Sequence, residues 1–154
     1  VISPSAQTSF ISSGTMNQVS TITAVEVTPG ITYRNVGAIP ITYVVSIPTF
    51  TVWQIATSTP PGPNQFRISG LWADPDLIPG VGKFQSDDYL TATPQTSTAV
   101  KFYNNANWSS ATKGGLNVPP GEDRTIYFMY EAPSSTTTSP NASVTVSVTA
   151  IAGQ

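Results

Sequence analysis

Residues 142–153, ASVTVSVTAIAG, alternate almost throughout between apolar and hydroxyl side chains. Val144, Val146, Val148 and Ala150 occupy every second position, and Ser or Thr residues fill the positions between them. Successive side chains of a strand point to opposite faces of a sheet, so this alternation predicts a strand with one buried and one solvated face. Similar runs recur along the chain between Pro, Gly and Asn residues, which favour turns. These features restrict the chain to folds made of short strands.

The alternating runs predict about eight or nine strands separated by turns, the pattern of a β-sandwich or barrel. In the clearest run, residues 41–47, we expect Thr42 and Ser46 to face outward. The side chains expected to face the core are Ile41, Tyr43, Val45 and Ile47. Residues 50–55 follow so closely that the two runs are either separate strands or one long strand bent at Pro48. Further strands are expected at residues 21–28, 31–36, 66–72, 89–93, 97–104, around 126–130 and at 143–151.

No amphipathic helical pattern of any length occurs in the sequence. The expected fold class is all-β: a single antiparallel β-sandwich, immunoglobulin-like or jelly-roll-like, without a substantial helix. A chain of 154 residues has the size of one domain with a real core. We assign residues 19–154 to the sandwich domain and treat residues 1–18 as an N-terminal extension.

Charge is scarce, because Asp, Glu, Lys and Arg make up 9% of the chain, against roughly 25% in an ordinary soluble domain, and the net charge is −2. The Lys and Arg residues are scattered singly, so the chain has no basic patch for nucleic acid. No run of about 18 apolar residues is present, so we expect no membrane-spanning segment. A weakly charged surface gives little repulsion between copies, which favours a protein that assembles with itself.

The chain begins with Val rather than Met, which we interpret as a mature chain whose leader has been removed. Two Asn-X-Ser triplets, at Asn107 and Asn141, are candidate N-glycosylation sites and fit a secreted protein of the extracellular space or cell surface. In a chain so rich in Ser and Thr such triplets also arise by chance, so both interpretations stay open.

Catalytic side chains are few, because the chain has no His and no Cys. Their absence excludes a Ser-His-Asp triad, a thiolate nucleophile and most transition-metal sites. The glutamates are Glu26, Glu122 and Glu131, of which Glu26 and Glu131 are a candidate glycosidase pair. Single solvated charges on strands are far commoner than catalytic pairs, so we expect that the protein is not an enzyme.

Residues 73–88 break the alternation and hold most of the Asp residues of the chain. Asp74, Asp76, Asp87 and Asp88 are a candidate site for a hard cation such as calcium, which binds clustered carboxylate oxygens. The spacing is not that of an EF-hand, and Asp-Pro and Asp-Asp pairs also form turns. A plain turn is the favoured interpretation and structural calcium the alternative. No other cofactor is expected.

Trp53 lies in a core-like pattern, which favours a structural role. Trp108 lies in the polar run NNANWSS and is a candidate for an exposed contact. That contact is either with a sugar or with a neighbouring subunit, since aromatic residues are enriched at interfaces.

The N-terminal extension, residues 1–18, is uncharged and carries isolated apolar residues. Ile2, Ala6 and Phe10 share one face of a strand at even spacing. A strand added to an open sheet edge satisfies unpaired N–H and C=O groups there. We therefore interpret the extension as a candidate donor strand for another copy of the chain. A locally packed or disordered terminus, and donation by the terminal strand at residues 143–151 instead, remain the alternatives.

Two stretches carry a resemblance. ITYRNVGAIPITYVVSI looks like the strand-Asn-X-Gly-strand hairpin of secreted immunoglobulin-like sandwich proteins, and VPPGEDRTIYFMYEAP followed by ASVTVSVTA resembles their closing pair of strands. Within that class the chain is similar to extracellular fibre subunits, namely the TasA/camelysin-type biofilm fibre proteins and the archaeal bundling pilins and threads. This resemblance implies polymerisation by donor-strand exchange, in which a terminal strand of one subunit completes the sheet of the next.

The sequence therefore predicts a structural subunit of an extracellular filament or pilus, polymerising head-to-tail with copies of itself by donor-strand complementation. One alternative is a secreted carbohydrate-binding or adhesion module with glycan or cell-surface partners, for which Trp108 or Trp72 would be exposed. Another is a viral capsid or decoration protein, although the chain lacks the basic arm expected of a genome-packaging capsid.

Overall fold

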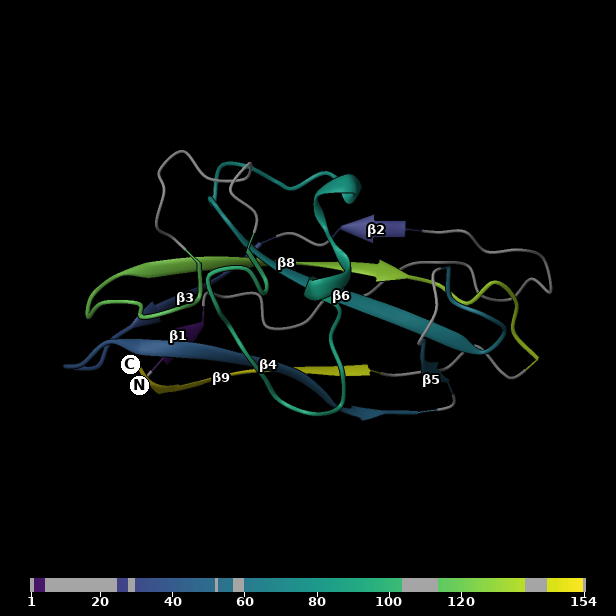
Figure 1. Cartoon of the computed structure of the whole chain (residues 1–154), viewed down its shortest axis with the longest axis horizontal. Helices are drawn as coiled ribbons and strands as arrows, with labels where there is room; N and C mark the ends of the chain where they lie inside the picture. The colour runs from purple at the N-terminus through teal and green to yellow at the C-terminus, as the bar shows by residue number, and fades with distance from the viewer. Residues whose placement is uncertain are drawn as a thin grey trace.

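The computed structural model of the chain describes residues 2–4, 25–27, 30–51, 53–56, 60–103, 114–137 and 144–153. Within these residues the chain forms two β-sheets that pack against each other as a sandwich (Figure 1). The same residues contain no α-helix, and their two 3-10 helices, η1 (Val81–Lys83) and η2 (Ser86–Asp88), have three residues each. The predicted all-β sandwich is thus confirmed. No helix of the described part is long and apolar enough to cross a membrane.

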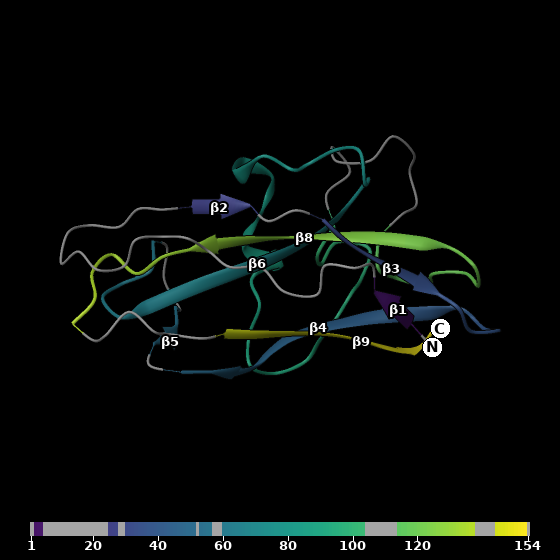
Figure 2. The ribbon, with the colours of Figure 1, turned by 180° about the vertical axis from the view of Figure 1, so that it is seen from behind.

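The larger sheet has the strand order β1-β3-β8-β6-β5, with β2 also paired to β8, and the smaller sheet has the order β7-β4-β9. Neighbouring strands run antiparallel except β5 and β6, which are parallel. Figure 2 shows both sheets from behind. The strands of the larger sheet are β1 (Ile2–Pro4), β2 (Val25–Val27), β3 (Ile31–Asn35), β5 (Gln54–Ile55), β6 (Gln65–Ala73) and β8 (Asp123–Glu131). Those of the smaller sheet are β4 (Ile41–Phe50), β7 (Gln95–Thr96) and β9 (Val144–Ala152).

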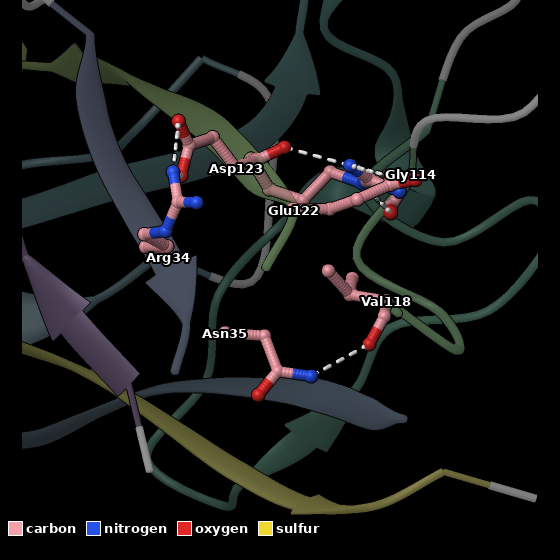
Figure 3. A network of polar contacts seen from close by, with 7 residues as sticks. Arg34, Asn35, Gly114, Val118, Glu122 and Asp123 are labelled. Atoms are coloured by element: carbon pink, nitrogen blue, oxygen red, sulfur yellow. Dashed lines mark hydrogen bonds and ion pairs between the residues drawn. The ribbon is translucent and has the colours of Figure 1, made fainter. Parts of the chain in front are cut away.

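The segment interpreted as a hairpin, ITYRNVGAIPITYVVSI, instead crosses from one sheet to the other, because β3 pairs in the larger sheet and β4 in the smaller. The closing strands β8 and β9 are separated in the same way. Asn35 fixes the first crossing: its Oδ1 accepts a hydrogen bond from the Gly37 N–H at 2.9 Å, and its amide donates to the carbonyls of Ile39 and Val118, each at 2.9 Å. Figure 3 shows the Asn35 amide directed at Val118. This buried side chain turns the chain away from its own sheet.

The main core lies between the sheets, where the predicted inward residues of β4 are buried: Tyr43, Val45 and Ile47 have no exposed surface. The Tyr43 ring stacks on Trp72 of β6 with ring centroids 4.7 Å apart. Tyr33 of β3 packs edgewise on Trp72 at 6.4 Å. Aromatic contacts therefore join both sheets across the sandwich.

Thr42 and Ser46, expected to face outward into solvent, are both buried. β4 is the middle strand of its sheet, and residues 114–118 lie along its first half. The Asn117 N–H donates to Oγ1 of Thr42 at 3.2 Å. The predicted inward face of β4 is confirmed, but the prediction that its hydroxyl face is solvated is wrong.

A second apolar cluster lies on the opposite face of the larger sheet. Tyr127 and Met129 of β8 pack there with Leu71 of β6 and with Phe84, which follows η1. The residues that alternate with them, including Phe128, belong to the main core. Both faces of β8 are consequently buried.

No strand forms at residues 89–93 or at 97–103, the described part of the strand expected at 97–104, and the short β7 lies between them. Residues 89–93 contribute a single isolated bridge, from Tyr89 to Ser69. In the second stretch, Oγ1 of Thr98 accepts hydrogen bonds from the N–H groups of Val100 and Lys101 at 3.3 and 2.9 Å, a local pattern that competes with strand pairing. Phe102 takes a φ of +59°, outside the range of strand backbone.

β4 continues through Pro48 but ends at Phe50, and Gln54–Ile55 form β5 in the larger sheet. Residues 41–55 are therefore not one bent strand, and the separate strands do not divide at Pro48. The register of β4 with β9 shifts between Ser46 and Thr49, a β-bulge. Pro48 thus lies where the ladder is interrupted and where its missing N–H costs little.

Replacing Asn35 by Ala tests the crossing between the sheets. The change removes three hydrogen bonds and takes the side-chain partner from the Gly37 N–H and the Ile39 carbonyl, while the Val118 carbonyl keeps the Ile41 N–H. We therefore expect a loss of roughly 2–4 kcal/mol in the free energy of unfolding. Chemical denaturation measures it, with the exposed neighbour Val36→Ala as the matched control, expected to change stability by no more than about 0.5 kcal/mol. Equal effects of the two substitutions would contradict the role of Asn35.

Candidate assembly surface

β9 is the edge strand of the smaller sheet. One side of this nine-residue strand pairs with β4 from Phe50↔Val144 to Ile41↔Ala152. No strand of the described part pairs with its other side. The strand contains no charged residue and no proline, two devices by which sheet proteins commonly protect an exposed edge. Within the part of the chain that the structure describes, β9 is therefore a long sheet edge open to a further strand.

The hydrogen-bonding phase of β9 follows from its partner. The Tyr43 N–H donates to Gly115 and the Tyr43 carbonyl accepts from Ser97, so the backbone groups of Tyr43 point away from β9. Antiparallel pairs alternate between hydrogen-bonded and non-hydrogen-bonded, so the pair Val44↔Thr149 is hydrogen-bonded and the pair Tyr43↔Ala150 is not. The odd-numbered residues of β9 thus bond to β4. The even-numbered residues, from Val144 to Ala152, direct their N–H and C=O groups to the open side.

The same even-numbered residues carry the apolar side chains of β9. Val144, Val146, Val148 and Ala150 pack against the main core but are only partly buried. On β4, one strand further in, Val45 has no exposed surface. The core is therefore incompletely covered at this rim of the sandwich.

β1 forms a second rim. It pairs with β3 in the register Ile2↔Asn35, Ser3↔Arg34 and Pro4↔Tyr33. The backbone groups of Asn35 bond to Gly121 and Glu122, on the side of β8. Pairs alternate along the ladder, so the pair Ser3↔Arg34 is hydrogen-bonded and the pair Pro4↔Tyr33 is not. The Pro4 nitrogen, which carries no hydrogen, therefore points away from β3. This rim is thus both short and closed to a further strand, unlike that of β9.

The donor prediction falls partly on this rim. Ile2 lies in β1 and pairs with the chain's own β3, whereas Ala6 and Phe10 lie outside the described residues. In both views, β1 and the C-terminal end of β9 lie at the same end of the sandwich (Figure 1 and Figure 2).

The four aspartates of the candidate calcium site lie in two places. The charges of Asp74 and Asp76 interact electrostatically with the Tyr127 hydroxyl, whereas those of Asp87 and Asp88 interact with the Lys101 ammonium. Among the described residues, the structure brings together no group of three or more acidic side chains of the kind that holds a metal ion. It favours the turn interpretation, since the Leu77 N–H donates to the Asp74 carbonyl and Asp88 belongs to η2.

Asp88 is a buried carboxyl group, 1% exposed. Its Oδ2 accepts a hydrogen bond from the Gln85 N–H at 2.8 Å, while Oδ1 has no hydrogen-bond partner in the part of the chain that the structure describes. Burial raises the pKa of Asp88 from 3.8 to about 6, although the Gln85 and Phe102 backbones and the Lys101 charge oppose the shift. Burial thus favours the protonated form of Asp88 more than solvent does.

The candidate glycosidase pair is not assembled as a pair of free carboxylates. Glu131 is bound by Arg67, with Nε to Oε2 at 2.5 Å and Nη2 to Oε1 at 2.7 Å. Arg67 is 1% exposed and lies over the Tyr89 ring. In the β2–β8 register Glu26 is opposite Tyr130, and Val25 is the residue opposite Glu131. Glu131 serves to neutralise a buried cation.

Glu122 is also in an ion pair, with its Oε2 2.8 Å from Nη1 of Arg124. Arg124 is buried and further donates to the carbonyls of Gly114 and Asp123 (Figure 3). Glu122 is itself exposed, as expected of a solvated charge, and it also neutralises a buried cation.

Trp53 is buried, as its pattern predicted. Trp72 is also completely buried, with its Nε1 donating to Oγ of Ser97 at 3.1 Å, so of the two tryptophans named for the binding-module alternative, Trp72 is not exposed. Trp108 and the candidate glycosylation sites Asn107 and Asn141 lie outside the described residues.

Three features of the surface escaped sequence reasoning. These are the pairing of Arg67 with Glu131, the closure of the first rim by Pro4, and the hydrogen-bonding phase of β9. The alternation of β9 divides its residues into two sets, but which set bonds to β4 depends on the pairing partner, which the sequence does not reveal. No protein-family model, curated protein or solved structure matches the chain.

Replacing Asp88 by Asn tests its burial. Because the folded-state pKa of Asp88 is raised to about 6, its contribution to stability is fully present below pH 3.8 and is lost as the pH rises through 6. An asparagine side chain cannot ionise, so we expect Asp88→Asn to gain roughly 1–3 kcal/mol relative to wild type between pH 4 and pH 7. Urea unfolding at both pH values measures the difference. The exposed Asp76→Asn is the control, and an identical pH dependence of wild type and Asp88→Asn would contradict the prediction.

Proposed function

We propose that the protein is a structural subunit of an extracellular filament, which polymerises head-to-tail with copies of itself by exchange of the N-terminal strand. The observation that carries the proposal is the position of β1. It is a three-residue edge strand, and β3 is its strand partner. A neighbour's residues 2–4 can take the same place with the same register.

Exchange of this strand conserves the contacts that it makes. Each hydrogen bond between β1 and β3 within one chain has an identical counterpart between two chains, so the balance depends on concentration and on the geometry of the connection. The acceptor edge is also part of the core, since Tyr33 of β3 is partly buried against the Tyr43 ring at 6.0 Å. An added strand therefore completes a sheet that already has a packed face.

The donor segment and the acceptor edge are different parts of one molecule, so each subunit offers one of each. Such heterologous contacts extend into open chains unless the rotation closes a ring. The low charge supports association, because few charges need to be desolvated when copies approach. A filament that uses this device outside the cell is consistent with a chain without thiols.

The carbohydrate-binding alternative has less support. Trp53 and Trp72 are buried and offer no ring to a sugar. Among the described residues, the structure also offers no pair of free carboxylates for hydrolysis at Glu131, which is occupied by Arg67.

A pair of cysteines at Ser3 and Arg34 distinguishes exchange from pairing within one chain. These residues are directly opposite in the β1–β3 register, and opposite Cα atoms lie about 5.5 Å apart at most, within disulfide range. The natural chain has no Cys, so no other thiol interferes. After oxidation of concentrated Ser3→Cys/Arg34→Cys protein, exchange gives a ladder of covalent oligomers on a non-reducing gel.

The single variants Ser3→Cys and Arg34→Cys are the controls and should give no ladder. A double variant that oxidises entirely to monomer, at concentrations where assembly is sought, would overturn the exchange.

Deleting residues 1–18 is a second test. We expect a folded protein that does not form fibres in negative-stain electron microscopy, because the donor strand is absent. Circular dichroism checks the fold, and addition of a peptide of residues 1–18 should restore the lost strand pairing. Unchanged fibres from the shortened chain would contradict the proposal.

A further inference from the structure

We infer that β9 is a self-complementary docking edge, which pairs antiparallel with β9 of a second copy about a two-fold axis at Val148. This lateral contact goes beyond the proposed strand exchange and uses a different edge. It joins two three-stranded sheets into one continuous sheet.

The backbone phase of β9 fits this arrangement. In an antiparallel pair centred on Val148, each residue meets the residue at equal distance on the other side of the centre. Val148 then meets its own counterpart, and Val146 meets Ala150 of the second copy. All of these are even-numbered residues, whose N–H and C=O groups face the open side. A centre between two residues would instead pair even-numbered residues with odd-numbered ones, whose groups already bond to β4. Val148 is the midpoint of β9, so a centre there pairs all nine residues of the strand.

The side chains are also self-complementary about the same centre. Reading outward from Val148, Ser147 meets Thr149 and Val146 meets Ala150, so hydroxyl groups lie opposite hydroxyl groups and apolar side chains opposite apolar ones. At the ends of the strand Val144 meets Ala152, a further apolar pair, whereas Thr145 meets Ile151. Matched neighbours of this kind stabilise pairing across strands.

Exposed apolar surface on β9 favours its burial against a second copy. The apolar residues of β9 are partly buried in one molecule, and Ile151 remains 47% exposed. No charge on β9 has to be desolvated or repels an identical strand. Natural sheets usually interrupt such an edge, as Pro4 does at the other rim, and here no proline or charge does so.

A disulfide test reads the register directly in the full-length chain. Ser147 and Thr149 would form a non-hydrogen-bonded pair between copies, with Cα atoms about 4.5 Å apart, whereas two Ser147 residues would be diagonal neighbours about 7–8 Å apart. A disulfide spans the first distance and not the second. Ser147→Cys protein is mixed with Thr149→Cys protein that carries a tag of different length, and the mixture is oxidised slowly.

The proposed pairing predicts at least about fivefold more disulfide-linked dimer in the mixture than in either variant alone, because only the mixture holds thiols within disulfide range. Equal yields in all three samples, or no dimer in any, would overturn the inference. Ala150→Pro, introduced into both variants, should abolish the dimer, since it removes an outward N–H and no hydrogen bond to β4.

The outcome is separate from that of the strand exchange. The ladder of the Ser3→Cys/Arg34→Cys protein reports the exchange, and the thiols introduced at Ser147 and Thr149 report the lateral pair. Either can fail while the other holds.

Discussion

Backbone hydrogen bonding at the rims of the two sheets is the constraint on which this structure depends. Interior strands such as β4 and β8 satisfy both of their edges, but each sheet must end somewhere. Within the described part, four of the five outer strands, β1, β2, β5 and β7, have two or three residues and expose little backbone. β9 has nine and leaves alternate N–H and C=O groups without a strand partner in the described part. An edge of this length is a liability for a monomer and a binding surface for an assembly.

Several of the few charges of the chain lie inside the fold. Arg67 and Arg124 are buried and neutralised by Glu131 and Glu122, while Asp88 is buried where protonation is favoured. The surface consequently carries fewer charged side chains than the composition alone suggests. Copies of such a protein can approach with little desolvation of charge, which often opposes association. Burial of charged side chains in the fold thus leaves a surface that copies of the protein can share.

The two proposed contacts differ in symmetry, and together they describe a particular kind of material. Strand exchange at β3 is heterologous, so it extends in one direction. Pairing along β9 is isologous and closes after two copies. A chain that uses both contacts makes filaments that associate laterally in pairs. The two rims also differ in protection, because Pro4 closes one to further addition and β9 has no such residue.

The sequence by itself determined the class of fold and the faces of its principal strands. Alternation depends on local geometry with a period of two, so it identified the inward residues Tyr43, Val45 and Ile47 correctly. It could not determine pairing, because hydrogen-bond partners far apart in sequence leave no periodic signal. The tertiary structure therefore decided that β3 and β4 lie in different sheets, that Thr42 is covered, and that Glu131 neutralises Arg67. It also decided which backbone groups of β9 face outward, since that phase is set by the contacts of Tyr43 on the far side of β4.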